Sequence, residues 1–297
     1  MKRIDTSKFG PWALVTGASS GIGKEFARQL AASGLNVVLV ARRLSTLEEL
    51  GGELAQTFGI RYRAIGLDLT SSDFIAKIAE ATHDLDIGLV VSNAGAMIAG
   101  DFLATDHQIW QQSLYLNVKA HLDLTHHFGQ HLVQRGRGGL LLTSSTTALQ
   151  GIPFAAEYAA AKAYVLTLGE ALHVELQKSG VHVTVLLPGA TDTPMITASG
   201  FDPAAMPVKL MSTKQCVAEG LAALNANRAT HIPGYLNRIM AAVVPRPLAT
   251  RMFGTMMQQI VAKQSTSAGT RASHSGQQPV SENPERSFPE NMLIDPS

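Results

Sequence analysis

The sequence predicts an α/β fold in which a single, doubly wound parallel sheet is flanked by helices on both faces. Short apolar runs rich in β-branched residues alternate along the chain with segments whose apolar residues recur at helical spacing. Strands that alternate with helices in this way pair in parallel and are joined by right-handed crossovers. No internal repeat interrupts the pattern, so one domain is expected over residues 1–235.

The elements follow one another in a regular order. The first strand, 12–16, leads through the turn GASSGIG into a helix over 24–34. The second strand, NVVLVA at 36–41, is a continuous apolar run, which is typical of a parallel strand buried on both faces. The remaining predicted elements are a helix at 44–58, a strand at 61–67, a helix after residue 71, a strand at 87–92, a helix at 107–135, a strand at 139–144, a helix that carries Tyr158, a strand at 181–187, a helix at 213–227 and a short strand near His231.

The composition of the chain limits the kinds of ligand that it can be expected to bind. The 297 residues are 45% hydrophobic and carry a formal net charge of +1, which fits a sizeable core and argues against nucleic acid as a ligand. Cys216 is the single cysteine, so neither an internal disulfide nor a cysteine-based zinc site can form, and a buried thiol is favoured over a reactive one. The first residues lack the apolar stretch of a signal peptide, so a cytoplasmic protein is expected.

Two C-terminal regions depart from the strand-helix rhythm. Residues 236–263 are rich in methionine and aliphatic side chains, and Pro245 and Pro247 break the helix within them. We interpret this segment as a lid or subunit contact over a lipophilic site. Association with a membrane surface is not favoured, because its arginines are sparse. Residues 264–297 have almost nothing to bury and are predicted to be a disordered tail.

A glycine-rich turn at the first strand-helix junction predicts a nucleotide site. In TGASSGIG the glycines allow tight turning and close backbone approach, and the helix N-terminus offers N–H groups to a pyrophosphate. The spacing is not GxGxxG, and a tight connection without a ligand is the alternative. The candidate ligand residues in this turn are Gly17, Ser19, Ser20, Gly21, Ile22 and Gly23.

The end of the second strand bears on the choice of dinucleotide. A cofactor with a free ribose 2′-OH calls for an acidic residue there, but the strand ends in Arg42 and Arg43. Guanidinium groups suit a 2′-phosphate, so NADP(H) is favoured over NAD(H), although both arginines could simply solvate a loop. Asp68, after the third strand, could reach the adenine edge or cap the following helix.

Tyr158 and Lys162 form a candidate proton-transfer pair. Four residues of helix advance about 6 Å and return almost to the same face, so the two side chains would be neighbours. A nearby ammonium group favours the phenolate and would lower the tyrosine pKa, which makes Tyr158 a candidate general acid. The alternative is a partly buried aromatic beside a solvated surface charge.

These motifs occur together in a recognisable order. They are TGASSGIG at 16–23, Asp68, NAG at 93–95, Asn117, Ser144 and Ser145, YAAAK at 158–162 and PGATDT at 188–193. Over residues 10–235 the sequence resembles the short-chain dehydrogenase/reductase family, and within it the NADPH-type, single-domain members. The resemblance implies a Rossmann-like domain and a homo-oligomer paired through its long helices. The hydrophobic C-terminal segment is similar to that of members acting on fatty acyl or other lipophilic carbonyls.

The resemblance also implies residue roles. Tyr158 would exchange the substrate proton, while Lys162 would lower its pKa and hold the nicotinamide ribose. Ser145 would hydrogen-bond the substrate oxygen with Ser144 in support, and Asn117 would hold a water that links Lys162 to solvent. The remaining cofactor contacts would come from Asn93, Ala94, Gly95, Pro188, Gly189 and Thr193, of which the first three form the floor and Thr193 binds the carboxamide.

One further cluster is set aside. His121, His126, His127 and His131 lie in one predicted helix, and the last two have the spacing of a metal pair. No cysteine joins them, so polar surface or a subunit contact is favoured, and no metal is expected.

The sequence therefore predicts an NADP(H)-dependent oxidoreductase that reduces a ketone or aldehyde, or oxidises the matching secondary alcohol. A lipophilic small-molecule substrate is expected. The alternative is a binding protein that senses NADP(H), with vestigial catalysis.

Overall fold

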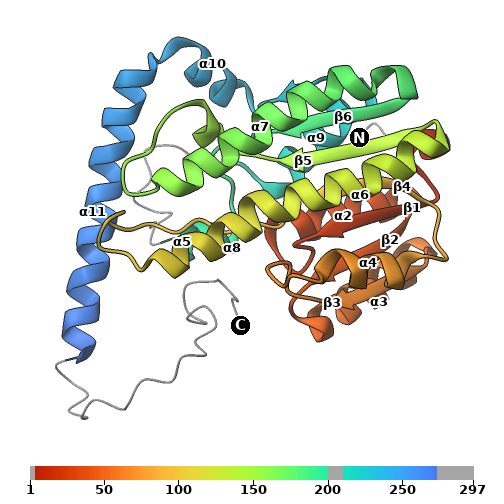
Figure 1. Ribbon diagram of the computed structural model, residues 1–297, viewed down its shortest axis with the longest axis horizontal. Helices are drawn as coiled ribbons and strands as arrows, with labels where there is room; N and C mark the ends of the chain where they lie inside the picture. Colours follow the sequence, from red (N-terminus) through yellow and green to blue (C-terminus); the bar gives the residue numbers. More distant parts are fainter. Residues whose placement is uncertain (1–3, 200–209, 273–297) are drawn as a thin grey trace.

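The computed structural model describes residues 4–199 and 210–272, with side chains as far as Val261. Within these residues a seven-stranded parallel sheet has the order β3-β2-β1-β4-β5-β6-β7 (Figure 1). The strands are β1 (Trp12–Thr16), β2 (Asn36–Ala41), β3 (Tyr62–Gly66), β4 (Ile87–Ser92), β5 (Gly138–Thr143), β6 (Val181–Leu186) and β7 (Thr230–His231).

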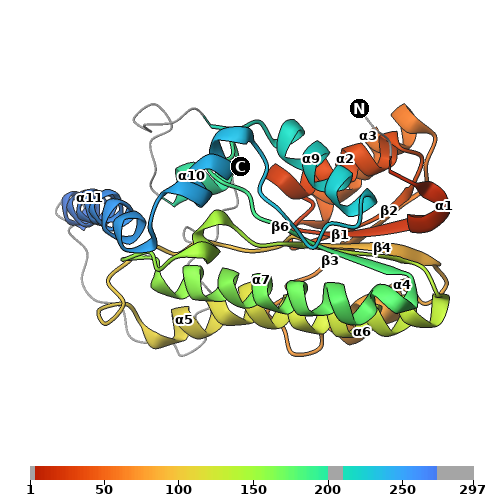
Figure 2. The ribbon, with the colours of Figure 1, turned by 90° about the horizontal axis from the view of Figure 1, so that it is seen from above.

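Helices cover both faces of the sheet. They are α1 (Thr6–Phe9), α2 (Gly21–Ala32), α3 (Leu44–Phe58), α4 (Phe74–Thr82), α5 (His107–Leu114), the π-helical η1 (Tyr115–Lys119), α6 (Ala120–Arg135), the 3-10 turns η2 (Thr146–Leu149) and η3 (Gln177–Ser179), α7 (Ala156–Leu176), α8 (Pro194–Ala198), α9 (Thr213–Asn225), α10 (Tyr235–Val243) and α11 (Arg246–Ala272). Figure 2 shows α2, α3 and α9 on one face and α4, α5, α6 and α7 on the other. The predicted doubly wound fold is confirmed.

Alternation along the central strands builds two separate cores. Ala13 and Val15 of β1 pack on the α2 side, whereas Trp12 and Leu14 pack on the side of α4 and α6. Both sets are buried because helices cover both faces. This double burial explains why the strands of the sequence are continuous apolar runs instead of alternating ones.

Two helices differ from the prediction. Helix α2 begins at Gly21, so the last glycine of the glycine-rich turn already lies in the first helical turn. The predicted helix at 107–135 is divided by η1, whose wider turns separate α5 from α6. Such π-helical insertions are frequent at functional sites, and η1 contains Asn117, which is fully buried.

The C-terminal segment lies outside the two helical layers. Pro245 separates α10 from α11 as predicted, whereas Pro247 lies in the first turn of α11 and does not break it. Helix α11 lies apart from the sheet at one end of the molecule (Figures 1 and 2). Helix α11 continues to Ala272, past the predicted start of a disordered tail at 264, because adding a residue to an existing helix costs little. The rest of that predicted tail, 273–297, lies outside the described residues. Within the described ranges no helix combines the length and the apolar character needed to cross a membrane.

Candidate active site

A cavity of about 1060 Å³ opens where the central strands end. Residues one or two positions after the ends of β1, β2, β4 and β6 line it, among them Gly17, Arg42, Asn93 and Pro188. The chain reverses its direction of winding between β1 and β4. Open α/β sheets bind their ligands in the crevice at such a point, so the topology alone indicates a binding site here.

The cavity brings together nearly all the predicted site residues. Those that line it are Gly17, Ser19, Ser20, Gly21, Ile22, Arg42, Arg43, Asp68, Asn93, Ala94, Gly95, Ser145, Tyr158, Lys162, Pro188, Gly189 and Thr193. Gly23 and Asn117 stand behind the wall and support it. A Cβ on Gly23 would collide with the carbonyl oxygen of Gly17, and the Asn117 side chain bonds the backbone of Ala96.

Glycines leave part of the cavity wall without side chains, so that a ligand can approach the backbone. Gly17 has a φ of +66°, and a Cβ there would come within 3.0 Å of Asn93 Nδ2. A Cβ on Gly95 would come within 2.8 Å of Asn117 Oδ1 and 3.1 Å of Lys162 Nζ. The turn leads directly into the N-terminus of α2, whose N–H groups and dipole favour a phosphate. The glycine-rich turn and the N-terminus of α2 together fit the pyrophosphate of a dinucleotide.

Thr16 is a site residue that the sequence analysis missed. Its Oγ1 accepts hydrogen bonds from the N–H groups of Asn93 and Ala94, at 2.9 and 3.1 Å. The Asn93 side chain donates in return to Thr16 O at 3.1 Å. Thr16 therefore joins the end of β1 to the NAG segment that follows β4, a contact that depends on the pairing of β1 with β4.

The acidic residue after β3 has a local partner. Asp68 Oδ1 accepts hydrogen bonds from Thr70 N at 2.8 Å and from Thr70 Oγ1 at 2.9 Å. It thus closes the turn after β3, while α4 begins further on, at Phe74. Asp68 also lines the cavity, as do Arg42 and Arg43, which follow β2.

Ser145, Tyr158 and Lys162 meet at the deep end of the cavity. Lys162 Nζ donates to Thr143 O at 3.1 Å and lies 5.7 Å from the ring centroid of Tyr158. Ser144 Oγ donates to Lys162 O at 2.7 Å, which fixes the helix beside β5. Both Tyr158 and Lys162 are buried, at 6% and 3% exposure, so the interpretation of Lys162 as a solvated surface charge is wrong.

Burial controls the charge states of this pair. It raises the pKa of Tyr158 to about 12, against the opposing effect of the Ser145 hydroxyl. It lowers the pKa of Lys162 to about 8, against the attraction of the Glu157 carboxyl group. The predicted lowering of the Tyr158 pKa is therefore wrong, because the loss of hydration on burial outweighs the hydrogen bond with Ser145. At neutral pH Tyr158 is a protonated phenol.

Comparisons with known proteins agree with this geometry. The family model described as short chain dehydrogenase matches residues 11–202. The chain belongs to the short-chain dehydrogenase family. It is accordingly an oxidoreductase that acts on the CH–OH and C=O groups of small molecules.

Three similar proteins illustrate this relationship. The dehydrogenase is 34% identical over 232 residues to 7beta-hydroxysteroid dehydrogenase of Clostridium sardiniense. The aligned region covers 78% of this chain and 88% of that protein. It superposes with a TM-score of 0.73 on a short-chain dehydrogenase from Sphingobium yanoikuyae in complex with NADPH, at 26% identity, covering 94% and 100% of the two chains. The bulky-bulky ketone specific alcohol dehydrogenase from Comamonas testosteroni gives a TM-score of 0.68 at 28% identity, covering 78% and 92%.

The outer end of the dehydrogenase's cavity is apolar. Helices α10 and α11 and the turn between them contribute mainly methionine, aliphatic and aromatic side chains to its wall, together with the polar Asn237, Arg246 and Gln259. The apolar residues are Met240, Ala241, Val244, Ala249, Met252, Phe253, Met256, Met257 and Ile260. Met257 and Ile260 also pack on Ile152, Ala155 and Ala159, close to Tyr158 along the chain. The C-terminal segment is therefore part of the same cavity as the reactive residues.

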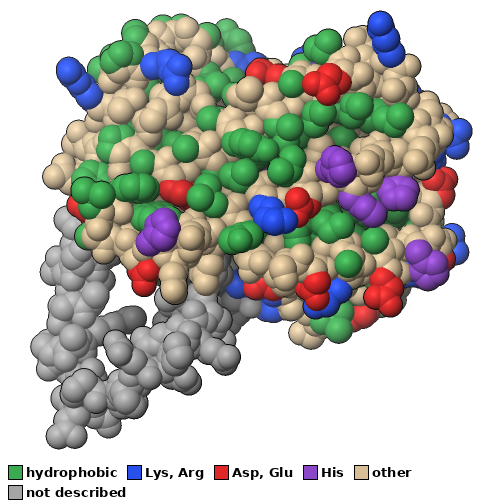
Figure 3. All heavy atoms as spheres, in the orientation of Figure 1, with side chains coloured by type: hydrophobic (Ala, Val, Ile, Leu, Met, Phe, Trp, Pro, Cys, Tyr) green, Lys and Arg blue, Asp and Glu red, His purple; other side chains and the backbone are tan. Residues whose placement is uncertain are grey.

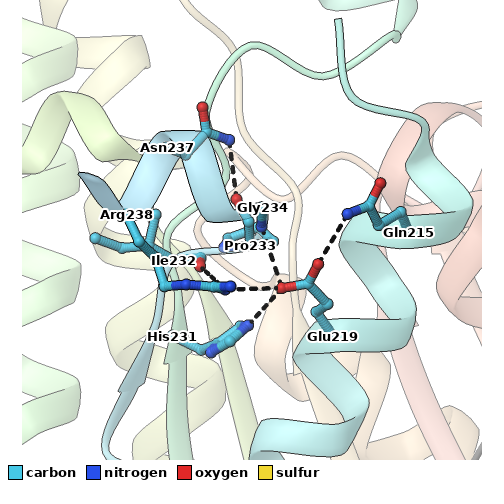
Figure 4. A network of polar contacts seen from close by, with 8 residues as sticks. All are labelled: Gln215, Glu219, His231, Ile232, Pro233, Gly234, Asn237 and Arg238. Carbon is cyan, nitrogen blue, oxygen red and sulfur yellow. Dashed lines mark hydrogen bonds and ion pairs between the residues drawn. The ribbon is translucent and has the colours of Figure 1, made fainter. Parts of the chain in front are cut away.

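A network around Glu219 anchors α10 to the body of the dehydrogenase (Figure 4). Glu219 Oε2 accepts hydrogen bonds from His231 Nε2 at 3.0 Å, Gly234 N at 3.1 Å and Arg238 Nη1 at 3.0 Å. Gln215 donates to the other carboxyl oxygen at 3.0 Å. These hydrogen bonds hold the pKa of Glu219 at about 2, against the opposite effect of its burial. The sequence analysis did not identify this anchor, because its members come from α9, β7 and α10.

The histidines of α6 have two different environments. His126 and His131 are exposed, and histidine side chains gather over α6 in Figure 3. His127 and His131 stack edge to face with ring centroids 4.8 Å apart. His121, in contrast, is buried and its Nδ1 lies 2.8 Å from Ser92 Oγ, so its assignment to the surface is wrong. Among the residues with described side chains, no group of three or more metal-binding side chains occurs.

Proposed function

We propose that this dehydrogenase reduces a bulky, lipophilic ketone with NADPH, or oxidises the matching secondary alcohol. The observation that carries the proposal is the continuity of one cavity. Ser145, Tyr158 and Lys162 line it together with the glycine-rich turn and the apolar side chains of α10 and α11.

Tyr158 supplies the proton, and Tyr158 and Ser145 together stabilise the negative charge that develops on the substrate oxygen. When bound, the nicotinamide cofactor supplies the hydride. As a carbonyl oxygen gains negative charge, Tyr158 donates its phenolic proton and the Ser145 hydroxyl donates a hydrogen bond to the same oxygen. The high pKa of Tyr158 suits this direction, because the residue stays protonated until the substrate oxygen becomes basic. Lys162, with a pKa of about 8, can hold or release a proton near neutral pH.

The preference for NADPH rests on the end of β2. Arg42 and Arg43 line the cavity there, where an acidic residue would select a free ribose 2′-OH. Two guanidinium groups favour the additional charge of a 2′-phosphate. The similar dehydrogenase from Sphingobium yanoikuyae in complex with NADPH supports this choice.

The preference for a bulky apolar substrate rests on α10 and α11. Apolar side chains dominate the outer wall, and the cavity is large enough for a cofactor together with a second organic molecule. Similarity to a hydroxysteroid dehydrogenase and to an alcohol dehydrogenase specific for bulky-bulky ketones supports the same class of substrate.

The catalytic role of Tyr158 is tested by the substitution Tyr158→Phe. We expect kcat for carbonyl reduction to fall at least about 100-fold, the usual contribution of a general acid, while the Kd for NADPH changes little. Tyr164→Phe, on an exposed part of the same helix, is the matched control and should retain activity. Full turnover by Tyr158→Phe would show that the proton comes from elsewhere.

Substrate and cofactor class are tested by a panel of ketones graded in size and apolarity, with NADPH and NADH in parallel. Activity should rise with apolar bulk and should require NADPH. In Arg42→Ala the KM for NADPH should rise more than that for NADH. Tight NADPH binding without turnover of any carbonyl would favour a protein that senses the cofactor.

A further inference from the structure

A buried acidic residue stands beside the reactive pair, and the proposed function does not use it. Glu157 precedes Tyr158 on α7 and is 7% exposed. Its Oε2 accepts a hydrogen bond from Ser113 Oγ of α5 at 2.6 Å. Ser113 Oγ in turn accepts from Asn117 Nδ2 of η1 at 3.0 Å. We call these three residues the Glu157 chain.

The direction of the hydrogen bonds in the Glu157 chain is determined at its acidic end. A carboxylate can only accept, so the Ser113 hydroxyl must give its proton to Glu157 and offer its lone pair to Asn117. The second N–H of the Asn117 amide donates to Ala96 O at 2.8 Å. With both N–H groups occupied in this way, Oδ1 is left to accept from Ala96 N at 3.2 Å on the side of Lys162.

The direction of these hydrogen bonds matters energetically because the residues that form them are buried. Ser113 and Asn117 are almost fully buried, so an amide turned the wrong way would leave donors and acceptors without partners. Among the described residues the Glu157 Oε1 atom has no hydrogen-bond partner. Burial raises the pKa of Glu157, and the Ser113 hydrogen bond and the charge of Lys162 lower it.

The carboxyl group also affects the charge of Lys162. The titratable groups that face Lys162 are Glu157 and Tyr158 of its own helix and His121 of α6. Burial keeps His121 and Tyr158 uncharged at neutral pH, because it lowers the pKa of the imidazole and raises that of the phenol. The attraction of the Glu157 carboxyl group opposes the loss of the ammonium proton by Lys162.

We propose that Glu157 is a positioning residue that, through Ser113, holds the Asn117 amide with its oxygen toward Lys162. This inference rests on the proposed role of Lys162 in the reaction. The residue touches neither substrate nor cofactor and acts through its neighbours.

The test is a titration of Lys162 that needs no turnover. Protein labelled with ¹³C at the lysine ε carbon is titrated by NMR, and the Lys162 signal is assigned by its loss in Lys162→Arg. Glu157→Gln keeps the shape but removes the charge, and its amide can donate as well as accept, so the direction of the hydrogen bonds through Ser113 is no longer fixed. We expect it to lower the midpoint of Lys162 by about one pH unit, the lower end of the effect of a close opposite charge.

Two further variants separate charge from packing. Ser113→Ala removes the hydrogen bond that favours the carboxylate, so it should shift the midpoint in the same direction by less. Glu170→Gln, at an exposed position of α7, should leave the midpoint unchanged. Thermal unfolding of each variant verifies that the fold is kept.

The outcomes distinguish this inference from the proposed function. A Lys162 midpoint in Glu157→Gln within about 0.2 pH units of the wild type overturns the inference, even if turnover falls. If the midpoint shifts in Glu157→Gln while the wild-type protein reduces none of the ketones, the inference is sustained and the proposed function is refuted. In an active enzyme, the basic limb of the kcat profile for reduction should move to lower pH in Glu157→Gln by the same amount as the midpoint.

Discussion

The anchor at Glu219 can be tested by removing a single charge. In Glu219→Gln the side chain keeps its size but loses the charge that faces His231 and Arg238. The folded-state pKa of Glu219 is about 2, compared with 4.5 as the reference value. That difference corresponds to roughly 3 kcal/mol of interaction that favours the folded state at neutral pH.

Solvent reduces this figure. The Glu219 side chain is 27% exposed and that of Arg238 is 44% exposed, so part of the interaction is screened. We therefore expect Glu219→Gln to lower the free energy of unfolding by about 2 kcal/mol at pH 7. For a domain of this size the loss corresponds to a decrease in Tm of roughly 4–8 °C.

The pH dependence of the effect follows from its sign. A carboxyl group with a depressed folded-state pKa stabilises the protein fully above the unfolded value, near 4.5, and loses that effect as the pH falls toward 2. The difference in Tm between wild type and Glu219→Gln should shrink to less than half by pH 3. Thermal unfolding from pH 7 to 3 measures this, with Glu175→Gln, an exposed glutamate of α7, as the control. A difference that does not change with pH, or an equal loss in the control, would refute the reasoning.

Three other predictions concern the glycine-rich turn, the cysteine and the outer wall. Gly23→Ala places a Cβ against the backbone of the turn and should weaken NADPH binding at least about tenfold in a fluorescence titration. The control is Gly52→Ala in α3, where the space around the added Cβ is open, and this variant should stabilise the protein by about 0.5–1 kcal/mol. Burial raises the pKa of the Cys216 thiol to about 12, so at pH 8 a thiol reagent should label the folded protein at least about 100-fold more slowly than the unfolded chain, and rapid labelling of folded protein would contradict this. Phe253→Ser should raise the KM for a bulky ketone more than that for a small one, while Val174→Ser, exposed on α7, should change neither.

Local patterns explain why the fold was predictable. Continuous apolar strands and helically spaced segments record burial on both faces of the sheet, so the order of the elements can be inferred without coordinates. The site motifs can be recognised in the sequence because each lies within a few consecutive residues. They are TGASSGIG, Asp68, NAG and YAAAK. Their shared cavity follows from topology, since the carboxyl ends of parallel strands lie along one edge of the sheet.

The errors share one physical cause. The charge states of Tyr158 and Lys162 depend on burial, which strands and helices distant in sequence impose together. His121 seemed to belong to a surface cluster, but η1 and α6 direct it into the protein beside Ser92. Helical spacing correctly predicted that Tyr158 and Lys162 are neighbours, but it carries no information on hydration.

The sequence by itself determined the class of fold, the family and a set of site residues of which nearly all line the cavity, because periodicity and short motifs are local properties of the chain. Only the tertiary structure decided the contacts between distant segments: Thr16 with NAG, Glu157 with Ser113 and Asn117, and Glu219 with α10. Each of these contacts joins residues of different elements, and each depends on distances and burial that exist only after the sheet and its helices have packed.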